Sequence, residues 1–379
     1  MRYHDIMKHK FPIVLCATLL SLSLRAETPP KVTVVSQDAA RTIYHSPQSP
    51  GYTAWCTLWR EPNGELRLAF QQVTGPVKEW SKRKNVTVIL GSSDEGATWK
   101  KLREVPARTN EGVANNTIYA APGSSSFSGH GFAVLNDGTL ITGLWPTGKD
   151  QSGFIQRSSN DGATWSAPIY VRDPDVYKMY PSQIHQLRDG RIILMCGMVK
   201  QADANTAKFL LKGFFESRDG GKTWSHIWTM PKEVGLCEES DFVELDTGDL
   251  LFIHRAEHYK DNTYINSDRL QTIFHRKGDG WEIGPTTAVP IPHSGYPELL
   301  KVREGPILHI GSDGVWEICP GLETWTKLNL SGSPYYPRAI QLKDGSVLVV
   351  GHVGGDDEYG KVDQTIVAQK FKLKVEAAK

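Results

Sequence analysis

The stretch from Ser92 to Trp99 reads SSDEGATW, and two later stretches repeat its pattern. They are SSNDGATW, from Ser158 to Trp165, and SRDGGKTW, from Ser217 to Trp224. All three fit S-x-[DN]-x-G-x-T-W. The Asp or Asn side chain can accept hydrogen bonds from turn amides, and the glycine can supply a positive φ. Because the closing Trp is a large apolar plate, we expect each octapeptide to be a structural hairpin turn, remote from any chemistry, with its Trp largely buried between sheets.

A second pattern consists of an apolar strand, a turn centred on glycine and another apolar strand. Its copies are centred on Gly64, Gly138, Gly190, Gly248, Gly305 and Gly345. Asp-Gly or Asn-Gly between alternating apolar strands is a strong hairpin signal. No region sustains the apolar period of a long helix. Repeated four-stranded units are the blades of a propeller, so the sequence predicts an all-β, six-bladed β-propeller with the octapeptides on its outer hairpins.

Charge and cysteine content limit the class of partner. Lys and Arg number 43 against 42 Asp and Glu, for a net charge of +1. This balance argues against nucleic acid or an anionic membrane as the main partner. Beyond Cys16, the cysteines are far apart and fit no zinc motif, so we expect no metal and no cofactor. Each lies in or beside an apolar run, which favours buried free thiols, although export permits disulfides. They are Cys56, Cys196, Cys237 and Cys319.

The first residues have the pattern of a secretory signal peptide. Lys8 and Lys10 precede an apolar run over 11–24, with Met7 as a plausible start, and a Pro-rich stretch follows. The run is too short to span a bilayer comfortably, which takes about 20 apolar residues. We therefore expect 1–26 to be a signal peptide, 27–379 to be the propeller, and the protein to be secreted or periplasmic with no membrane span.

The octapeptide resembles the Asp-box, or bacterial neuraminidase repeat, and three copies on six blades resemble the sialidase superfamily. The resemblance covers Lys31 to Lys374. It implies that KVTVV, near the start, and QTIVAQKFKLK, near the end, lie together in the last blade and close the ring. It also implies an active site with a nucleophilic Tyr, a Glu that takes its proton, an acid/base Asp and three carboxylate-binding arginines.

Two stretches resemble the family at these positions. EESDFVELDTGDLLFIHR is similar to the glutamate-bearing strand, which implies Glu239 as proton acceptor and Arg255 as a carboxylate-binding arginine. YYPRAIQLKDG is similar to the tyrosine strand of the last blade, which implies Tyr336 as nucleophile. A Tyr suits a substrate whose anomeric carbon bears a carboxylate, because a carboxylate nucleophile would be repelled, and it is an exception to the usual pair of carboxylates.

Other positions depart from the family pattern. The blade-one strand, GYTAWCTLW, has no Arg between Tyr52 and Trp59. The loop VKEWSKRKNVTVIL has no Asp, so Glu79 or Glu111 is the candidate acid. For the missing arginines the candidates are Arg338 and Arg41. Lys82, Arg83 and Lys84 form a further basic run, which is either part of the site or a solvated surface.

Tyr180 and Tyr296 share the Tyr-Pro context of Tyr336. This context is either a strand-entry device repeated with the blades or a set of rings lining a sugar-binding funnel. His185 joins them as a candidate substrate-binding residue. The four histidines near blade strands are too scattered for a metal site: His130, His185, His254 and His293.

The sequence thus predicts a sialidase-like retaining exo-glycosidase for a terminal sialic acid or related acidic sugar, with a glycan as its partner. Two alternatives stay open. One is a carbohydrate-binding propeller without catalysis, favoured by the missing arginine and Asp. The other is a lyase or hydrolase of uronic-acid-containing polysaccharide that uses the histidines.

Overall fold

A computed structural model of the chain describes most residues from 31 onward. The described residues are 31–49, 51–76, 79, 82, 84–106, 131–144, 152–162, 164–171, 176–200, 211–231, 234, 236–260, 263–291, 295–318, 325–353, 363 and 365–376. The predicted signal peptide lies outside them. Among the described residues, no helix is long and apolar enough to cross a membrane.

The described residues form six antiparallel sheets, which we number as blades one to six. Blade one is β3 (Tyr52–Arg60), β4 (Leu66–Thr74), β5 (Lys84–Ser92) and β6 (Lys100–Pro106). Blade two is β7 (Phe132–Val134), β8 (Leu140–Leu144) and β9 (Phe154–Ser158). Blade three is β10 (Val176–Gln186), β11 (Ile192–Lys200), β12 (Leu211–Ser217) and β13 (Ser225–Thr229).

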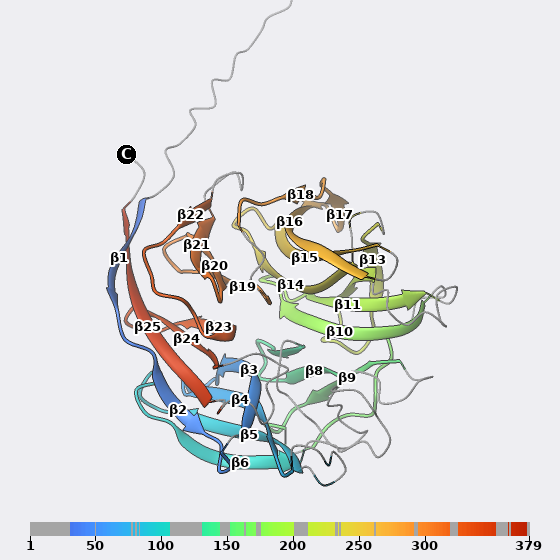
Figure 1. Cartoon of the computed structure of the whole chain (residues 1–379). Helices are drawn as coiled ribbons and strands as arrows, with labels where there is room; N and C mark the ends of the chain where they lie inside the picture. Colours follow the sequence, from blue (N-terminus) through green and yellow to red (C-terminus); the bar gives the residue numbers. More distant parts are fainter. Residues whose placement is uncertain are drawn as a thin grey trace, which may run out of the picture.

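Blade four is β14 (Leu236–Glu244), β15 (Leu250–Lys260), β16 (Thr263–Lys277), β17 (Gly280–Ile283) and β18 (Thr287–Ala288). Blade five is β19 (Glu298–Lys301), β20 (Ile307–Gly311), β21 (Gly314–Ile318) and β22 (Trp325–Lys327). Blade six is β23 (Tyr335–Gln341), β24 (Val347–His352), β25 (Thr365–Glu376), β1 (Lys31–Gln37) and β2 (Arg41–His45). The sheets follow one another around a ring, as Figure 1 shows, and this confirms the six-bladed propeller.

Blade six joins the two ends of the described chain. The long strand β25 pairs with β1 along its second half and with β2 along its first half. Both segments expected in the last blade therefore lie there, at the left of Figure 1. The side chain of Gln37 also bonds Ser331 Oγ at 2.7 Å, between blade six and the strand connection after β22.

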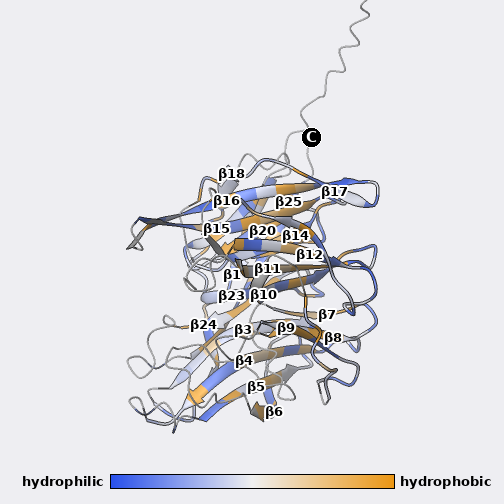
Figure 2. Cartoon of the chain, turned by 90° about the vertical axis from the view of Figure 1, so that its right-hand side faces the viewer, coloured by the Kyte–Doolittle hydropathy of each residue, from blue (hydrophilic) through white to orange (hydrophobic). Residues whose placement is uncertain are grey.

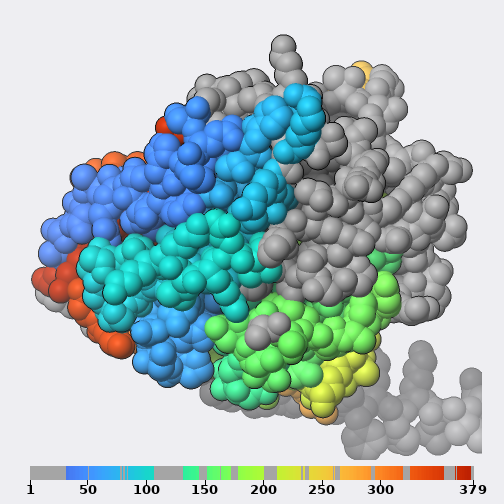
Figure 3. All heavy atoms as spheres, turned by 90° about the horizontal axis from the view of Figure 1, so that it is seen from below, coloured from blue at the N-terminus to red at the C-terminus, as the bar shows by residue number. Residues whose placement is uncertain are grey.

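Apolar clusters fill the seams between neighbouring blades. One cluster joins Leu66 and Val88 of blade one to Leu348 and Val350 of blade six. Another joins Ile89 of blade one to blade two, and further clusters fill the remaining seams around the ring. The side view in Figure 2 shows the apolar residues concentrated on the strands. In the view from below, the blue-to-cyan surface of residues 31–106 lies beside the green surface of the sheets that follow (Figure 3).

The three octapeptides form the same hydrogen-bonded turn after the third strand of their blades. In the first, the Ser92 Oγ accepts from Gly96 N at 2.8 Å, and Asp94 accepts from Thr98 N at 2.8 Å and Thr98 Oγ1 at 2.6 Å. The corresponding bonds recur around Asn160 and around Asp219. Gly96 has φ +76°, and a Cβ there would meet Leu348 Cδ2 of blade six at 2.8 Å. The glycine is therefore required by both conformation and space.

The tryptophans of the octapeptides pack against the seams and are partly buried there, not fully enclosed. Trp165 packs on the seam between blades one and two. Trp99 and Trp224 pack on the seams before their own blades. Cys56 and Cys196 are buried free thiols, as predicted. The side chain of Cys237 and all of Cys319 lie outside the described residues.

Candidate functional site

The site lies where the inner strands begin. In every blade a hairpin of the same length joins the inner strand to the second strand. The residue pairs that close these hairpins are Arg60–Leu66, Val134–Leu140, Gln186–Ile192, Glu244–Leu250, Lys301–Ile307 and Gln341–Val347. The third strand runs in the same direction as the first, so the octapeptides lie at the hairpin end. The starts of the inner strands lie at the opposite end.

A break in register occurs near the start of four inner strands. It falls between Ala54 and Thr57 in β3, between Pro181 and Gln183 in β10, between Cys237 and Ser240 in β14, and between Tyr335 and Arg338 in β23. Bulges re-aim side chains and are frequent beside functional sites. Glu239 and Tyr336 both lie within such a break.

Tyr336 and Glu239 meet between blades six and four. The Tyr336 hydroxyl donates a short hydrogen bond to Glu239 Oε1. Arg255 Nη1 donates to Glu239 Oε2 at 2.6 Å, and its Nη2 pairs with Glu257 Oε1 at 2.6 Å. Glu239 is only 6 % exposed. The sequence-predicted Tyr, Glu and Arg are therefore brought together in one hydrogen-bonded chain, which continues to Glu257.

Neighbouring carboxylates keep Arg255 charged. Burial alone would lower the pKa of Arg255, but the carboxylates of Glu239 and Glu257 outweigh burial, so its pKa is raised. Glu239 accepts one hydrogen bond on each of its two oxygens. Arg255 is therefore a permanent cation beside the Tyr336–Glu239 pair.

A second arginine, Arg269, lies beside Arg255 and was not predicted. It is 2 % exposed, and its Nη2 donates to the Gly295 carbonyl at 2.6 Å. Burial lowers its pKa to about 10, with Glu239 and Asp313 raising it and Arg255 lowering it. Its Nε and Nη1 have no hydrogen-bond partner among the described residues, nor have both ring nitrogens of His309 and both oxygens of Asp313.

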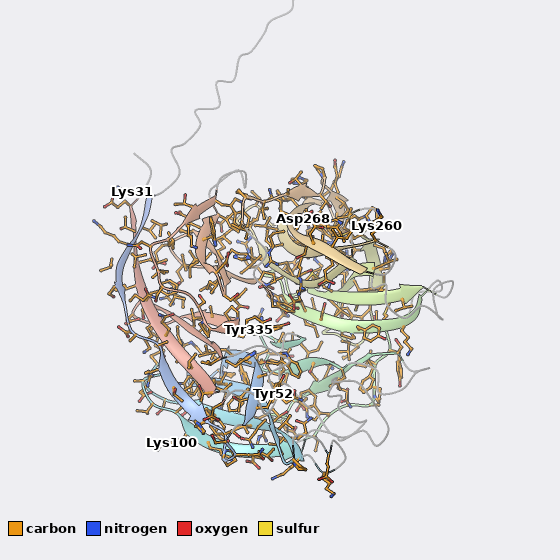
Figure 4. The ribbon with its side chains drawn as sticks, in the orientation of Figure 1. Lys31, Tyr52, Lys100, Lys260, Asp268 and Tyr335 are labelled. Carbon is orange, nitrogen blue, oxygen red and sulfur yellow. The ribbon has the colours of Figure 1, made fainter. Side chains whose placement is uncertain are left out.

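Aromatic rings pack around the Tyr336 ring. Tyr296 lies 5.8 Å from the Tyr336 ring, Tyr335 lies 4.8 Å away, and His352 stacks on it at 5.8 Å, measured between ring centroids. Burial raises the pKa of Tyr296 well above its usual value and lowers that of His352 to about 3, so both rings stay neutral. Figure 4 shows the neighbouring Tyr335 closer to the ring centre than the peripheral Lys31, Lys100 and Lys260.

Farther along the axis, Arg338 holds blades together. Its Nη1 pairs with Glu298 Oε2 at 2.7 Å, while Glu298 Oε1 accepts from Ala339 N at 2.9 Å. Arg338 Nε also reaches the Cys56 carbonyl at 3.4 Å. The guanidinium is 9 % exposed and joins blades five, six and one. The structure thus places Arg338 in an ion pair between blades, and its predicted contact with substrate stays a prediction.

Asp241 forms an equivalent brace one blade earlier. It accepts from Gln183 Nε2 at 3.0 Å and from Leu299 N at 2.7 Å, linking blades three, four and five. Burial, followed by repulsion from Glu298, raises its pKa well above its usual range. His185 Nε2 lies 3.4 Å from Asp241 Oδ1 with 35 % of its side chain exposed. Desolvation of the ring, and then the positive charge of Arg338, lower the pKa of His185, so the ring is neutral.

The remaining sequence candidates lie in several places. Tyr180 is half-buried on β10, next to the register break at Pro181. Arg41 donates to the Gly96 carbonyl in the first octapeptide, at the hairpin end, so it does not replace a site arginine. Glu79 pairs with Lys82, and both are exposed. Lys84 lies 3.5 Å from Glu104.

His254 is fully buried against Thr272 and the Phe252 ring, in the core rather than the site. The candidates Arg83, Glu111, His130 and His293 lie outside the described residues. No group of three or more His, Cys, Asp or Glu among the described residues is arranged to hold a metal ion.

Comparisons with known proteins identify the fold class but no family. No family model matches the sequence, and no curated protein matches it. The α-L-arabinanase of Penicillium chrysogenum, solved with arabinobiose, is similar in structure, with a TM-score of 0.63, 16 % identity, and coverage of 88 % of this chain and 98 % of that one.

Two sialic-acid enzymes are also similar in structure. A sialidase of Streptococcus pneumoniae gives a TM-score of 0.58 at 11 % identity, over 88 % of this chain and 71 % of that one. The intramolecular trans-sialidase of Ruminococcus gnavus gives 0.54 at 13 % identity, over 87 % and 96 %. At such identities the likeness establishes the propeller fold alone.

Proposed function

We propose that this protein is a retaining exo-glycosidase in which Tyr336 is the nucleophile and Glu239 is the base that takes its proton. The observation that carries the proposal is the hydrogen-bonded chain from Tyr336 through Glu239 to Arg255. A nucleophile, its base and a third group that orients the base are the arrangement that covalent catalysis needs.

The proton transfer is difficult without help. Tyr has an ordinary pKa near 10 and Glu near 4.3, so moving the proton costs about 8 kcal/mol at ~1.4 kcal/mol per unit. Arg255 interacts electrostatically with Tyr336 as well as with Glu239. Its positive charge therefore stabilises the phenolate that forms during attack.

The covalent step then balances as follows. The Tyr336 oxygen bonds to the anomeric carbon as the glycosidic carbon–oxygen bond breaks, and Glu239 holds the phenol proton. An acid must protonate the leaving oxygen, and Glu79 and Glu111 stay the candidates from the sequence. Water afterwards attacks the anomeric carbon and gives its proton to the acid residue that was deprotonated in the first step, while the tyrosyl oxygen departs and takes its proton back from Glu239.

For the substrate we propose a terminal sialic acid or a related sugar with a carboxylate on the anomeric carbon. This carboxylate would repel an Asp or Glu nucleophile but not a neutral phenol, which explains the use of Tyr336. Arg255 and Arg269, side by side, are the cations available to attract it.

A neutral terminal sugar is the second candidate substrate. It is favoured because Arg255 and Arg338 are already paired with carboxylates of the protein. Both Nη atoms of Arg255 are bound by carboxylates, and Arg338 is bound by Glu298. A site whose cations are already paired has less positive potential for a substrate carboxylate.

Covalent trapping tests both candidates. The protein is incubated with a fluorinated sialosyl donor or a fluorinated arabinofuranosyl donor and digested, and the labelled peptide is sequenced by mass spectrometry. Sialosyl label on the Tyr336 oxygen supports the proposal, and arabinofuranosyl label there supports the neutral-sugar candidate. Label on a carboxylate, or turnover with inverted stereochemistry, contradicts the tyrosine mechanism.

A further inference from the structure

Trp55 occupies the blade-one position that corresponds to the two reacting residues. Along the chain it precedes the last paired residue of its hairpin, Arg60, by the same number of residues as Glu239 precedes Glu244 and Tyr336 precedes Gln341. Because the hairpins are of equal length, equivalent positions stand at the same height along the axis. Trp55 therefore begins its inner strand at the level of Tyr336.

The backbone of Trp55 shares the conformation of Tyr336. Both residues lie inside the register break of their strand, and both have positive φ, 55° for Trp55 and 48° for Tyr336. The other positive-φ residues besides glycine, among those described, are Glu95 and Asp161 in octapeptide turns. This conformation is a genuine outlier for a bulky side chain and costs roughly 1–3 kcal/mol.

A backbone contact beside Trp55 links its strand to the strand of Tyr336. The Cys56 carbonyl, one residue on, accepts from Arg338 Nε, which lies two residues beyond Tyr336. The indole packs edge-on against Tyr52, with ring centroids 5.9 Å apart, and beside Val73. It is only half-buried, so part of the ring remains free to contact another molecule. Trp55 is strained and half-exposed, and it lies at the level of the nucleophile. Packing alone does not explain an indole here, because a glycine or alanine would leave the packing to the neighbouring side chains.

We propose that Trp55 is a substrate-binding residue whose indole takes the C–H face of the sugar ring held at Tyr336 and Glu239. The proposal rests on the proposed function for the location of the sugar. The chemistry is that of a large apolar π surface, which a ring's C–H face covers while its hydroxyls point elsewhere. A register break and a left-handed backbone carry the phenol of Tyr336 to Glu239, and Trp55 has the same break and the same backbone conformation.

The test measures sugar binding and stability separately. All variants carry Tyr336→Phe, so that no turnover occurs, and are titrated by calorimetry with the methyl α-ketoside of N-acetylneuraminic acid and with arabinobiose. Trp55→Ala and Trp55→Gly are each expected to weaken binding of the better sugar by 10-fold or more, whereas Trp55→Phe retains most of it. Trp59→Phe, on the same strand but buried in the seam with Phe132, is the matched control and leaves binding unchanged.

The comparison of glycine with alanine separates contact from scaffolding. Glycine adopts positive φ without strain, so Trp55→Gly should unfold at a higher temperature than Trp55→Ala while losing binding to the same extent. If Trp55 merely holds the strand, the glycine variant would recover binding together with stability, and the proposal would be wrong. It is equally overturned if the parent binds neither sugar. Failure of Tyr336 as nucleophile would leave these binding results unchanged, so the two proposals fail separately.

Discussion

Arg255 lies directly opposite Arg269 across the β15–β16 ladder, so a part-buried and a fully buried arginine share one face of blade four. Like charges opposite each other destabilise a sheet unless they are compensated. Here Glu239 and Glu257 bind Arg255, and Asp313 interacts electrostatically with Arg269. The charge that a substrate meets is therefore set by the carboxylates as much as by the arginines.

Changing Glu257 to Gln tests this balance. The amide oxygen can still accept from Arg255 Nη2, but one negative charge disappears. We expect the KM for a carboxylate-bearing aryl glycoside to fall about fivefold, or ~1 kcal/mol, because the charge is only partly screened. The KM for a neutral glycoside should stay the same. A fall for both substrates would point to altered geometry instead.

Tyr336→Phe removes the attacking oxygen and keeps the ring. We expect kcat to fall to background while the melting temperature changes little, since the ring still packs against Tyr296 and His352. Glu239→Gln should lower kcat by about 10²–10⁴-fold. Tyr44→Phe removes a hydroxyl that is bonded to Gln72 and not to Tyr336, Glu239 or Arg255, and is the control that should keep full activity. Retained turnover in Tyr336→Phe would refute the mechanism.

The Arg338–Glu298 ion pair should carry stability. Both side chains are about nine-tenths buried, so Arg338→Met leaves a buried carboxylate without its partner. Loss of one member of such a pair typically costs about 3–5 kcal/mol. The double variant Arg338→Met/Glu298→Gln should regain part of this loss, as measured by urea unfolding. If both variants unfold like the parent, the pair contributes nothing to blade docking.

Replacing Trp165 by Ala tests the structural role of the octapeptides. Half of a side chain that buries ~150–250 Å² when fully covered corresponds to roughly 2–3 kcal/mol at ~25 cal/mol per Å². We expect that loss in the free energy of unfolding and no change in sugar affinity, because Trp165 lies at the hairpin end of its blade. Weaker sugar binding at unchanged stability would place the octapeptide in the site.

Asp94→Asn should reduce sensitivity to acid. Hydrogen bonds from Thr98, above all from its hydroxyl, lower the pKa of Asp94 below its ordinary value. A lowered folded-state pKa gives stability that is present above the unfolded pKa, about 3.9, and is lost as pH falls through the folded value. The Asn variant should keep the turn, as Asn160 does in the second copy, and should show a shallower loss of stability below about pH 4. Equal acid profiles would contradict this.

The fold was predictable because its signals are local and repeated. A glycine hairpin such as that around Gly248 and an octapeptide such as Ser92–Trp99 each determine their own turn, and the ring follows from their number. The roles of Tyr336, Glu239 and Arg255 were predicted from a resemblance to one family. The structure adds their mutual contact, which no local pattern contains.

What the sequence did not reveal depends on contacts between blades. Glu298 and Asp241 lie in ordinary strands, and only the ring brings them to Arg338 and Gln183. Arg255 and Arg269 lie on successive strands, and only the strand register shows them as neighbours. Nothing in GYTAWCTLW singles out Trp55, since a bulge and a positive φ have no signature in that stretch.

The closure of blade six has a kinetic consequence. Among the described strands, β1 pairs with β25 alone, so during synthesis it must wait until nearly the whole described chain has been made. Until then β1, with three of its residues Val, is an unpaired strand of the kind that associates with other chains. Ring closure is a contact of very long sequence separation and is therefore slow. Folding yield should consequently depend on how well β1 is protected before its partner arrives.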